Sequence, residues 1–268
     1  MNETTMLSIK EFSEFSGVNQ STLRYYDEIG LLMPASRGKN NYRYYVPLQL
    51  IKLNYINLLV HLGVKLSVIK DLDSDRKPES IIDLLSQQED KLIFKLDELR
   101  EAASVMHTYR RNISRGLSAE DGVIRIEDRD EAKYALGDVN DFSRHETFYE
   151  EFIRFCKSAD DKHINLNYPI GGYHENVDNF LKSPGRPDRF YSMDPFGKST
   201  QPPGKYLAGY RRCFYGEFGD LSDRMMEYAQ EHDLGLKGPV LEIYLLDEIT
   251  VSDHEQFLLC VWVGISKL

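Results

Sequence analysis

Cysteine is scarce in this 268-residue chain, which has three, namely Cys156, Cys213 and Cys260. No two of them stand at the spacing of a zinc-ligand pair or a redox motif. Sparse, unpaired thiols are typical of a reducing compartment, so we expect a cytoplasmic protein without a disulfide framework. We also expect neither a cysteine-bound metal nor any other cofactor.

Long hydrophobic runs are also missing. No apolar stretch reaches the ~18 to 20 residues that a membrane-spanning helix needs. The opening sequence "MNETTMLSIK" lacks a basic segment followed by an apolar core, so we expect no secretory signal. With 41% hydrophobic and 28% charged residues, the composition is that of a globular protein with one large or two ordinary domains.

An excess of positive charge is absent from the chain as a whole, whose formal net charge is −10. The charge is unevenly distributed, however. Residues 1–70 hold eight Lys/Arg against five Asp/Glu, whereas the rest of the chain holds 25 against 38. The total therefore does not exclude a nucleic-acid partner for the basic N-terminal part.

The basic N-terminal part opens with residues that predict two short helices. Ser8 can cap a first helix, and Gly17 supplies a turn. Asn19 can then cap a second helix, "QSTLRYYDEIG", which Gly30 ends. Two short helices joined by a tight turn are typical of a helix-turn-helix.

A turn-forming "GKNN" leads into the aromatic "YRYY" and predicts a small hairpin, or wing. Alternation sends Arg43 and Tyr45 to one side of its strand and Tyr42 and Tyr44 to the other. A helix from Pro47 and a short helix over 65–72 follow.

The second helix has an inward side with Leu23 and Tyr26, and a polar outward side near its start. Such a helix end can enter a major groove, while basic wing residues contact phosphates. The alternative is that the tyrosines merely fill a small core. The predicted DNA-binding residues are Ser21, Thr22, Arg24, Tyr25, Arg37, Lys39, Tyr42 and Arg43.

A heptad pattern covers residues 78–115. Five apolar residues recur at seven-residue spacing: Leu85, Leu92, Leu99, Met106 and Ile113. The partner positions hold Ile82, Glu89, Leu96, Ala103 and Arg110. The pattern predicts a two-chain coiled coil and hence a homodimer. The alternative is a helix packed along the chain's own second domain.

The remaining segment changes period and predicts strands interrupted by two amphipathic helices, an α+β fold with an open antiparallel sheet. Glu242 is the one charge inside an apolar strand over 240–246. A carboxylate there must be paired, be neutralised, or face a cavity. The paired alternative would be a salt bridge to Arg211 or Arg212.

Taken in order, "LSIKEFSEFSGVNQSTLRYYDEIGLLMP", "YRYY" and "PLQLIKLNYI…HLGV" resemble the MerR family of transcriptional regulators. The resemblance implies a winged helix-turn-helix in 1–76, a dimerisation helix in an antiparallel coiled coil in 77–117, and an effector domain in 118–268. Such dimers bind a pseudo-palindrome in a promoter with an overlong spacer. The activated form distorts the spacer so that RNA polymerase can align both promoter elements.

The third segment resembles the GyrI-like effector domain of the multidrug-binding members, through "PPGKYLAGYRRCFYGEFGDL" and "VLEIYLLDE". The metal and iron-sulfur sensors of the family are not favoured, because no cysteine precedes Cys156. The resemblance implies that Glu242 is the acid under a lipophilic cation, which aromatic ring faces also attract. It assigns the ligand box to Glu242, Tyr168, Cys213, Phe218, Tyr244 and Phe257.

Catalytic constellations are missing too. GyrI-like domains also resemble some small-molecule hydrolases, but only Asp247 and Glu248 lie close to Glu242 along the chain. His254 and Cys260, six residues apart, are a weak signal. We therefore expect a regulator and not an enzyme, with a hydrolase or a repressor with a vestigial effector domain as alternatives.

Overall fold

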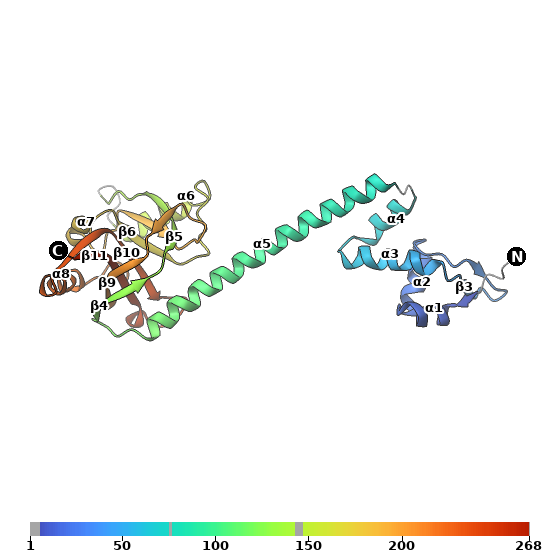
Figure 1. Ribbon diagram of the computed structural model, residues 1–268, viewed down its shortest axis with the longest axis horizontal. Helices are drawn as coiled ribbons and strands as arrows, with labels where there is room; N and C mark the ends of the chain where they lie inside the picture. The colour runs from blue at the N-terminus through green and yellow to red at the C-terminus, as the bar shows by residue number, and fades with distance from the viewer. Residues whose placement is uncertain (1–5, 75–76, 143–146, 268) are drawn as a thin grey trace. The chain divides into compact units, whose positions relative to one another are not determined.

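The computed structural model describes residues 6–74, 77–142 and 147–267 (Figure 1). The chain forms two compact units, Met1–Leu99 and Arg100–Leu268. Every helix in the described part of the chain is too short or too polar to cross a membrane.

The N-terminal unit is a small helical domain with a three-stranded sheet. Its elements are β1 (Leu7–Ser8), α1 (Ile9–Ser16), α2 (Gln20–Glu28), β2 (Ser36–Arg37), β3 (Arg43–Tyr45), α3 (Gln49–His61) and α4 (Leu66–Ser74). Ser8 and Glu11 cap α1 reciprocally. Gly17 follows with φ 70°, a conformation that favours glycine. Asn19 precedes α2, but its side chain makes no capping hydrogen bond.

Aromatic residues form much of this unit's core. The Tyr45 ring is fully buried and stacks on Phe12 with centroids 4.5 Å apart. Tyr26 is also buried, beside Leu23 on the inward side of α2. The core alternative for the tyrosines therefore holds for Tyr26 and Tyr45, whereas Tyr25 is half exposed.

The long helix α5 (Pro78–Leu117) has 40 residues. Its residue Leu84 belongs to the core of the N-terminal unit, whereas Ile113 packs against the core of the C-terminal unit. Ile113 of the heptad is thus partly buried against the sheet of its own chain, as the alternative predicts. The other large apolar members of the stripe are 39–68% exposed: Ile82, Leu85, Leu92, Leu96, Leu99 and Met106.

The C-terminal unit is built on an eight-stranded antiparallel sheet, which confirms the α+β prediction. The strand order is β4-β9-β11-β10-β6-β7-β5-β8. Strand bounds are β4 (Ile124–Arg129), β5 (Ala132–Val139), β6 (Ile170–His174), β7 (Arg189–Ser192), β8 (Ser199–Gln201), β9 (Gly204–Arg212), β10 (Leu234–Leu246) and β11 (Leu258–Lys267). The helices are α6 (Phe148–Ser158), α7 (Val177–Lys182) and α8 (Leu221–Glu231), with a 3-10 turn at His254–Gln256.

Alternation along β10 sorts its residues between the two faces of the sheet. Leu241 and Ile243 join the core on which α5 packs, together with Trp262. Val240 and Tyr244 join the core under α7 and α8. Glu242 shares the second face, because it is two residues from each of them.

Candidate ligand pocket and nucleic-acid interface

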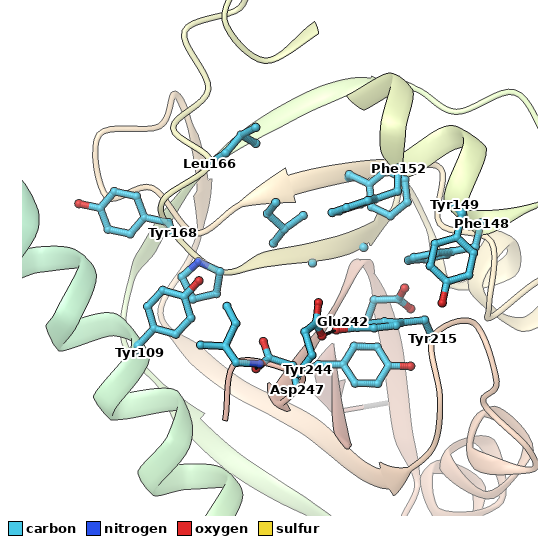
Figure 2. Close-up of a pocket in the computed structure, with 17 residues that line it drawn as sticks. Tyr109, Phe148, Tyr149, Phe152, Leu166, Tyr168, Tyr215, Glu242, Tyr244 and Asp247 are labelled. Atoms are coloured by element: carbon cyan, nitrogen blue, oxygen red, sulfur yellow. Dashed lines mark hydrogen bonds between the residues drawn. The ribbon is translucent and has the colours of Figure 1, made fainter. Parts of the chain in front are cut away.

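A cavity of about 290 Å³ lies within the C-terminal unit (Figure 2). Its wall comes from the helices α5 and α6, from the strands β6, β7 and β10, and from three loops: the one before β6 and those after β9 and β10. Eight aromatic side chains line it: Tyr109, Phe148, Tyr149, Phe152, Tyr168, Phe190, Tyr215 and Tyr244. Three acids also line it, Glu242, Asp247 and Glu248, and the described lining includes no lysine, arginine or histidine. The wall is aromatic and acidic.

Glu242 lies between two neighbouring strands, opposite Gly172 of β6 and Val261 of β11. A Cβ at Gly172 would come within 2.2 Å of the Glu242 Oε1 atom. Only a residue without a side chain leaves room for the carboxylate at this point. Gly172 therefore provides the space in which Glu242 reaches the cavity.

His174 is the polar partner of Glu242. Its Nε2 atom lies 3.2 Å from Glu242 Oε2, and the imidazole is fully buried against the Phe180 ring. The His174 Nδ1 atom has no hydrogen-bond partner among the described residues. Burial raises the pKa of Glu242, and the contact with His174 lowers it in part.

The alternative for Glu242, a salt bridge to Arg211 or Arg212 of β9, is not formed. Arg211 pairs instead with Asp220, with Nη1 3.6 Å from Oδ1. The Arg212 guanidinium donates to the carbonyl of Gln256 at 2.9 Å. Strand β11 separates β9 from β10 in the sheet, so these arginines pair with closer residues.

Tyrosine rings form the wall beside Glu242. Tyr215 meets Tyr244 at a centroid distance of 4.5 Å and 61°, and stacks on Phe148 at 6.0 Å. The Tyr215 hydroxyl donates to the Glu248 carboxylate, and the Tyr244 hydroxyl donates to the Phe214 carbonyl at 2.8 Å. These hydrogen bonds fix the two rings, so the wall is pre-formed around the acid.

The structure brings three of the six ligand-box residues to the cavity: Glu242, Tyr168 and Tyr244. Cys213 and Phe257 contact lining residues without lining the cavity themselves, with Cys213 Sγ 3.7 Å from the Tyr244 hydroxyl. Phe218 is buried in the core under α8, next to Phe180.

Sequence reasoning missed six of the eight aromatic lining residues: Tyr109, Phe148, Tyr149, Phe152, Phe190 and Tyr215. It also missed His174. Phe148 and Phe152, four residues apart on a predicted helix, were the available signal for an aromatic face.

The outward side of α2 is open to solvent. Ser21, Arg24 and Tyr25 are exposed, while Thr22 is partly buried. Arg24 makes one weak contact, from Nη2 to Gln20 Oε1 at 3.4 Å. In the β2–β3 hairpin, Lys39 and Tyr42 are exposed as well.

The two wing arginines are held by an acid that sequence reasoning missed. Arg37 Nη2 and Arg43 Nε each lie 2.6 Å from Asp27 Oδ2. The Asp27 side chain is only 3% exposed. These ion pairs join the hairpin to α2, and they occupy part of each guanidinium. Arg37 also donates to Asn41 Oδ1 at 3.1 Å.

The chain is similar in sequence to known regulatory proteins. The family model for the MerR family regulatory protein matches residues 8–45. The multidrug-efflux transporter 2 regulator of Bacillus subtilis is 25% identical over 250 residues, which are 91% of each chain. The regulator HmrR of Rhizobium leguminosarum bv. viciae is 33% identical over 100 residues, 35% of this chain and 77% of that one. The transcriptional activator mta of Bacillus subtilis is 29% identical over 150 residues, 54% of this chain and 53% of that one.

Proposed function

The chain belongs to the MerR family of regulatory proteins, and we propose that it is a transcriptional regulator switched by lipophilic cations. The observation that carries the proposal is the aromatic cavity around Glu242, in a chain that also has a winged helix-turn-helix. The cavity receives the signal, and the N-terminal unit binds promoter DNA.

The ligand class follows from the chemistry of the wall. Ring faces attract cations, and the attraction is strongest where water is excluded. Glu242, Asp247 and Glu248 add negative charge, and no basic side chain of the described lining opposes a cation. A relative with a multidrug-efflux name, the transporter 2 regulator of Bacillus subtilis, supports the same class.

The DNA contacts fall on α2 and the hairpin. Arg24 and Tyr25 are placed to meet a major groove, and Lys39 to meet phosphate. The ion pairs of Asp27 with Arg37 and Arg43 fix the hairpin against α2, so both surfaces meet DNA in one geometry. The N–H groups of both arginines that do not bind Asp27 can still donate to phosphate.

The partner for the exposed stripe of α5 is a second copy of the chain. A stripe of large apolar side chains along one helix is costly to leave in water. Ile82, Leu92 and Leu99 belong to the heptad and are each at least half exposed. A two-chain antiparallel coiled coil would cover them. On a promoter with an overlong spacer, such a dimer would act with RNA polymerase as an activator, as the name of the relative mta also suggests.

Calorimetry with a permanently charged probe, benzyltrimethylammonium, tests the ligand class. Glu242→Gln should weaken binding on the order of 10- to 100-fold, because the buried counter-charge is removed. Glu255→Gln is the matched control, since Glu255 is exposed and does not line the cavity. Equal affinities for wild type and Glu242→Gln would refute the role of Glu242.

Promoter binding at fixed salt tests the DNA face. Arg24→Ala should weaken it about 5- to 100-fold, in the range of a lost base or phosphate contact. Lys10→Ala is the control, because Lys10 lies on α1 and pairs only with Glu14 among the described residues. Unchanged affinity for Arg24→Ala would remove Arg24 from the interface.

A further inference from the structure

His174 and Glu242 form an isolated polar pair beside the aromatic wall. We propose that this pair stores one proton while the cavity is empty and that a bound cation expels it, so that cation sensing is coupled to proton release. The inference rests on the proposed cation site and adds a specific role for His174, which does not itself line the cavity.

The isolation of the pair is the first step. The His174 side chain is fully buried, the Glu242 side chain is 7% exposed, and their one mutual contact spans 3.2 Å. Among the described residues, no other hydrogen bond or ion pair reaches the Glu242 carboxylate or the His174 ring, and the Tyr191 hydroxyl donates to the Glu242 backbone carbonyl at 3.3 Å. The charged groups at the end of β6 and the start of β7 bind elsewhere: Glu175 pairs with Arg189 at 3.0 Å, and Asp188 accepts from Glu175 N and Asn179 Nδ2.

The charge of the empty cavity is the second step. Without a proton, the pair would carry one negative charge, next to the two further acids Asp247 and Glu248. Burial makes that charge unfavourable, and no lysine or arginine of the described lining compensates it. One shared proton makes the pair neutral overall, whether Glu242 is a carboxylic acid or His174 is an imidazolium.

The other titratable groups around Glu242 are phenols, one thiol and the two acids already named. Burial raises the pKa of the neighbouring thiol to about 11 and raises the pKa of four of the phenols, which stay uncharged near neutral pH. These groups are Cys213, Tyr109, Tyr191, Tyr215 and Tyr244. Tyr149 of α6 adds a further phenol to the wall. None of these supplies the missing positive charge.

Cation binding then exchanges one charge for another. A cation over the tyrosine rings favours an ionised Glu242 within the same low-dielectric site. The proton leaves to the solvent, the pair becomes a carboxylate beside a neutral imidazole, and the cation balances the carboxylate. The charge of the filled site equals that of the empty one.

His174 is a positioning residue in this scheme. Its contact with Glu242 lowers the pKa of that carboxyl from the value burial alone would give. His174 therefore sets the pH above which Glu242 is already ionised, so that a cation binds without first displacing a proton. The register between β6 and β10 places His174 opposite Val240, on the same face of the sheet as Glu242.

The test is calorimetry of the full chain with benzyltrimethylammonium, which has no proton of its own to exchange. Titrations at one pH in phosphate and in Tris differ in buffer ionisation enthalpy, so the difference in observed heat counts the protons released. We expect up to one proton per site. Below the midpoint of the pair, the affinity should fall tenfold per pH unit. The neutral carbon analogue, neopentylbenzene, should release none.

Two variants separate the roles within the pair. Glu242→Gln should abolish proton release as well as weaken binding. His174→Phe should keep proton release and move the midpoint of the affinity profile to higher pH, because the contact that lowers the Glu242 pKa is lost. His174→Gln, which can still donate a hydrogen bond, should move it less. A merely structural His174 would change affinity without moving the midpoint.

The outcomes are distinguishable from failure of the proposed function. Cation binding with the same heat in both buffers across the pH range overturns proton storage and leaves the cation site standing. Absence of cation binding by the wild type even at pH 8.5 overturns the proposed ligand class itself.

Discussion

Each of the two units has a buried acid at its candidate site, and these two acids, Asp27 and Glu242, have different partners. Asp27 in the N-terminal unit has two guanidinium groups 2.6 Å away. Glu242 in the C-terminal unit has a single imidazole 3.2 Å away and a cavity beside it. Their side chains are similarly inaccessible, 3% and 7% exposed. Burial alone therefore does not distinguish a structural acid from a ligand-binding one.

The number and charge of the partners make the distinction. A buried carboxylate needs compensation from inside the protein or from a ligand. Asp27 is compensated by two permanent cations, so it can serve as a clamp between α2 and the hairpin. Glu242 is compensated only in part, which leaves an electrostatic demand that a cation entering the cavity can meet. Incomplete pairing beside a cavity is thus what distinguishes the proposed ligand site.

Asp27→Asn should give the largest effect on stability. It leaves Arg37 and Arg43 without their common acid and should destabilise the N-terminal unit by about 3–5 kcal/mol, as for other broken buried pairs. Urea unfolding followed by far-ultraviolet circular dichroism would measure the loss. The fluorescence of Trp262, the single tryptophan, reports the C-terminal unit and should not shift.

Glu14→Gln is the matched control for Asp27→Asn. Glu14 pairs with Lys10 at 3.9 Å, and both side chains are largely exposed. Such surface pairs contribute roughly 0–1 kcal/mol. Equal losses for Asp27→Asn and Glu14→Gln would show that the clamp contributes no more than a surface pair.

The next largest effect is expected from Gly172→Ala, and it should be on ligand binding. The new methyl group would lie 2.2 Å from the Glu242 Oε1 atom and displace the carboxylate. Overpacking of this kind should weaken benzyltrimethylammonium binding roughly tenfold. Isothermal calorimetry on Gly172→Ala, Glu242→Gln and the double variant measures the coupling. Independent, additive losses would mean that Gly172 does not act through Glu242.

Much of the architecture could be predicted from the sequence, because local signals specify it. The cap at Ser8, the turn at Gly17 and the heptad stripe each depend on residues a few positions apart. The strands and helices that were missed are β5, β8 and α7 in the C-terminal unit and the two-residue β1 in the N-terminal unit. The β5 sequence "AKYALGDV" mixes small, polar and apolar residues without a clear alternation, while β8 and α7 are only three and six residues long. The expected strand over "HINLNYPIGGY" is confirmed only from Ile170, where β6 begins, and the residues before it form turns and a loop.

The sites were less predictable, because pairing between distant elements decides them. Glu242 stood out as a lone charge in an apolar strand, yet its partner His174 is 68 residues away. Asp27 lies on a helix whose sequence gives no reason to connect it with Arg43, 16 residues later. Phe218 was predicted to line the cavity by alignment. It lies in the segment between β9 and α8, and its side chain is buried in the core under α8. Side-chain partners across strands must be read from the fold.

The smallest expected effect is a pH dependence of stability that Glu242 causes and Asp27 does not. Burial raises the pKa of Glu242 above its ordinary value of 4.5, so the folded state holds a proton that the unfolded chain has lost. The stability this proton gives is fully present below the unfolded pKa and is lost as pH rises through the folded pKa, at no more than about 1.4 kcal/mol per pH unit. Urea unfolding followed by Trp262 fluorescence from pH 4.5 upward should show this fall. Glu242→Gln should flatten it, whereas Asp27→Asn should leave it unchanged. A slope that persists in Glu242→Gln would assign the proton to another group and weaken the contrast between the two acids.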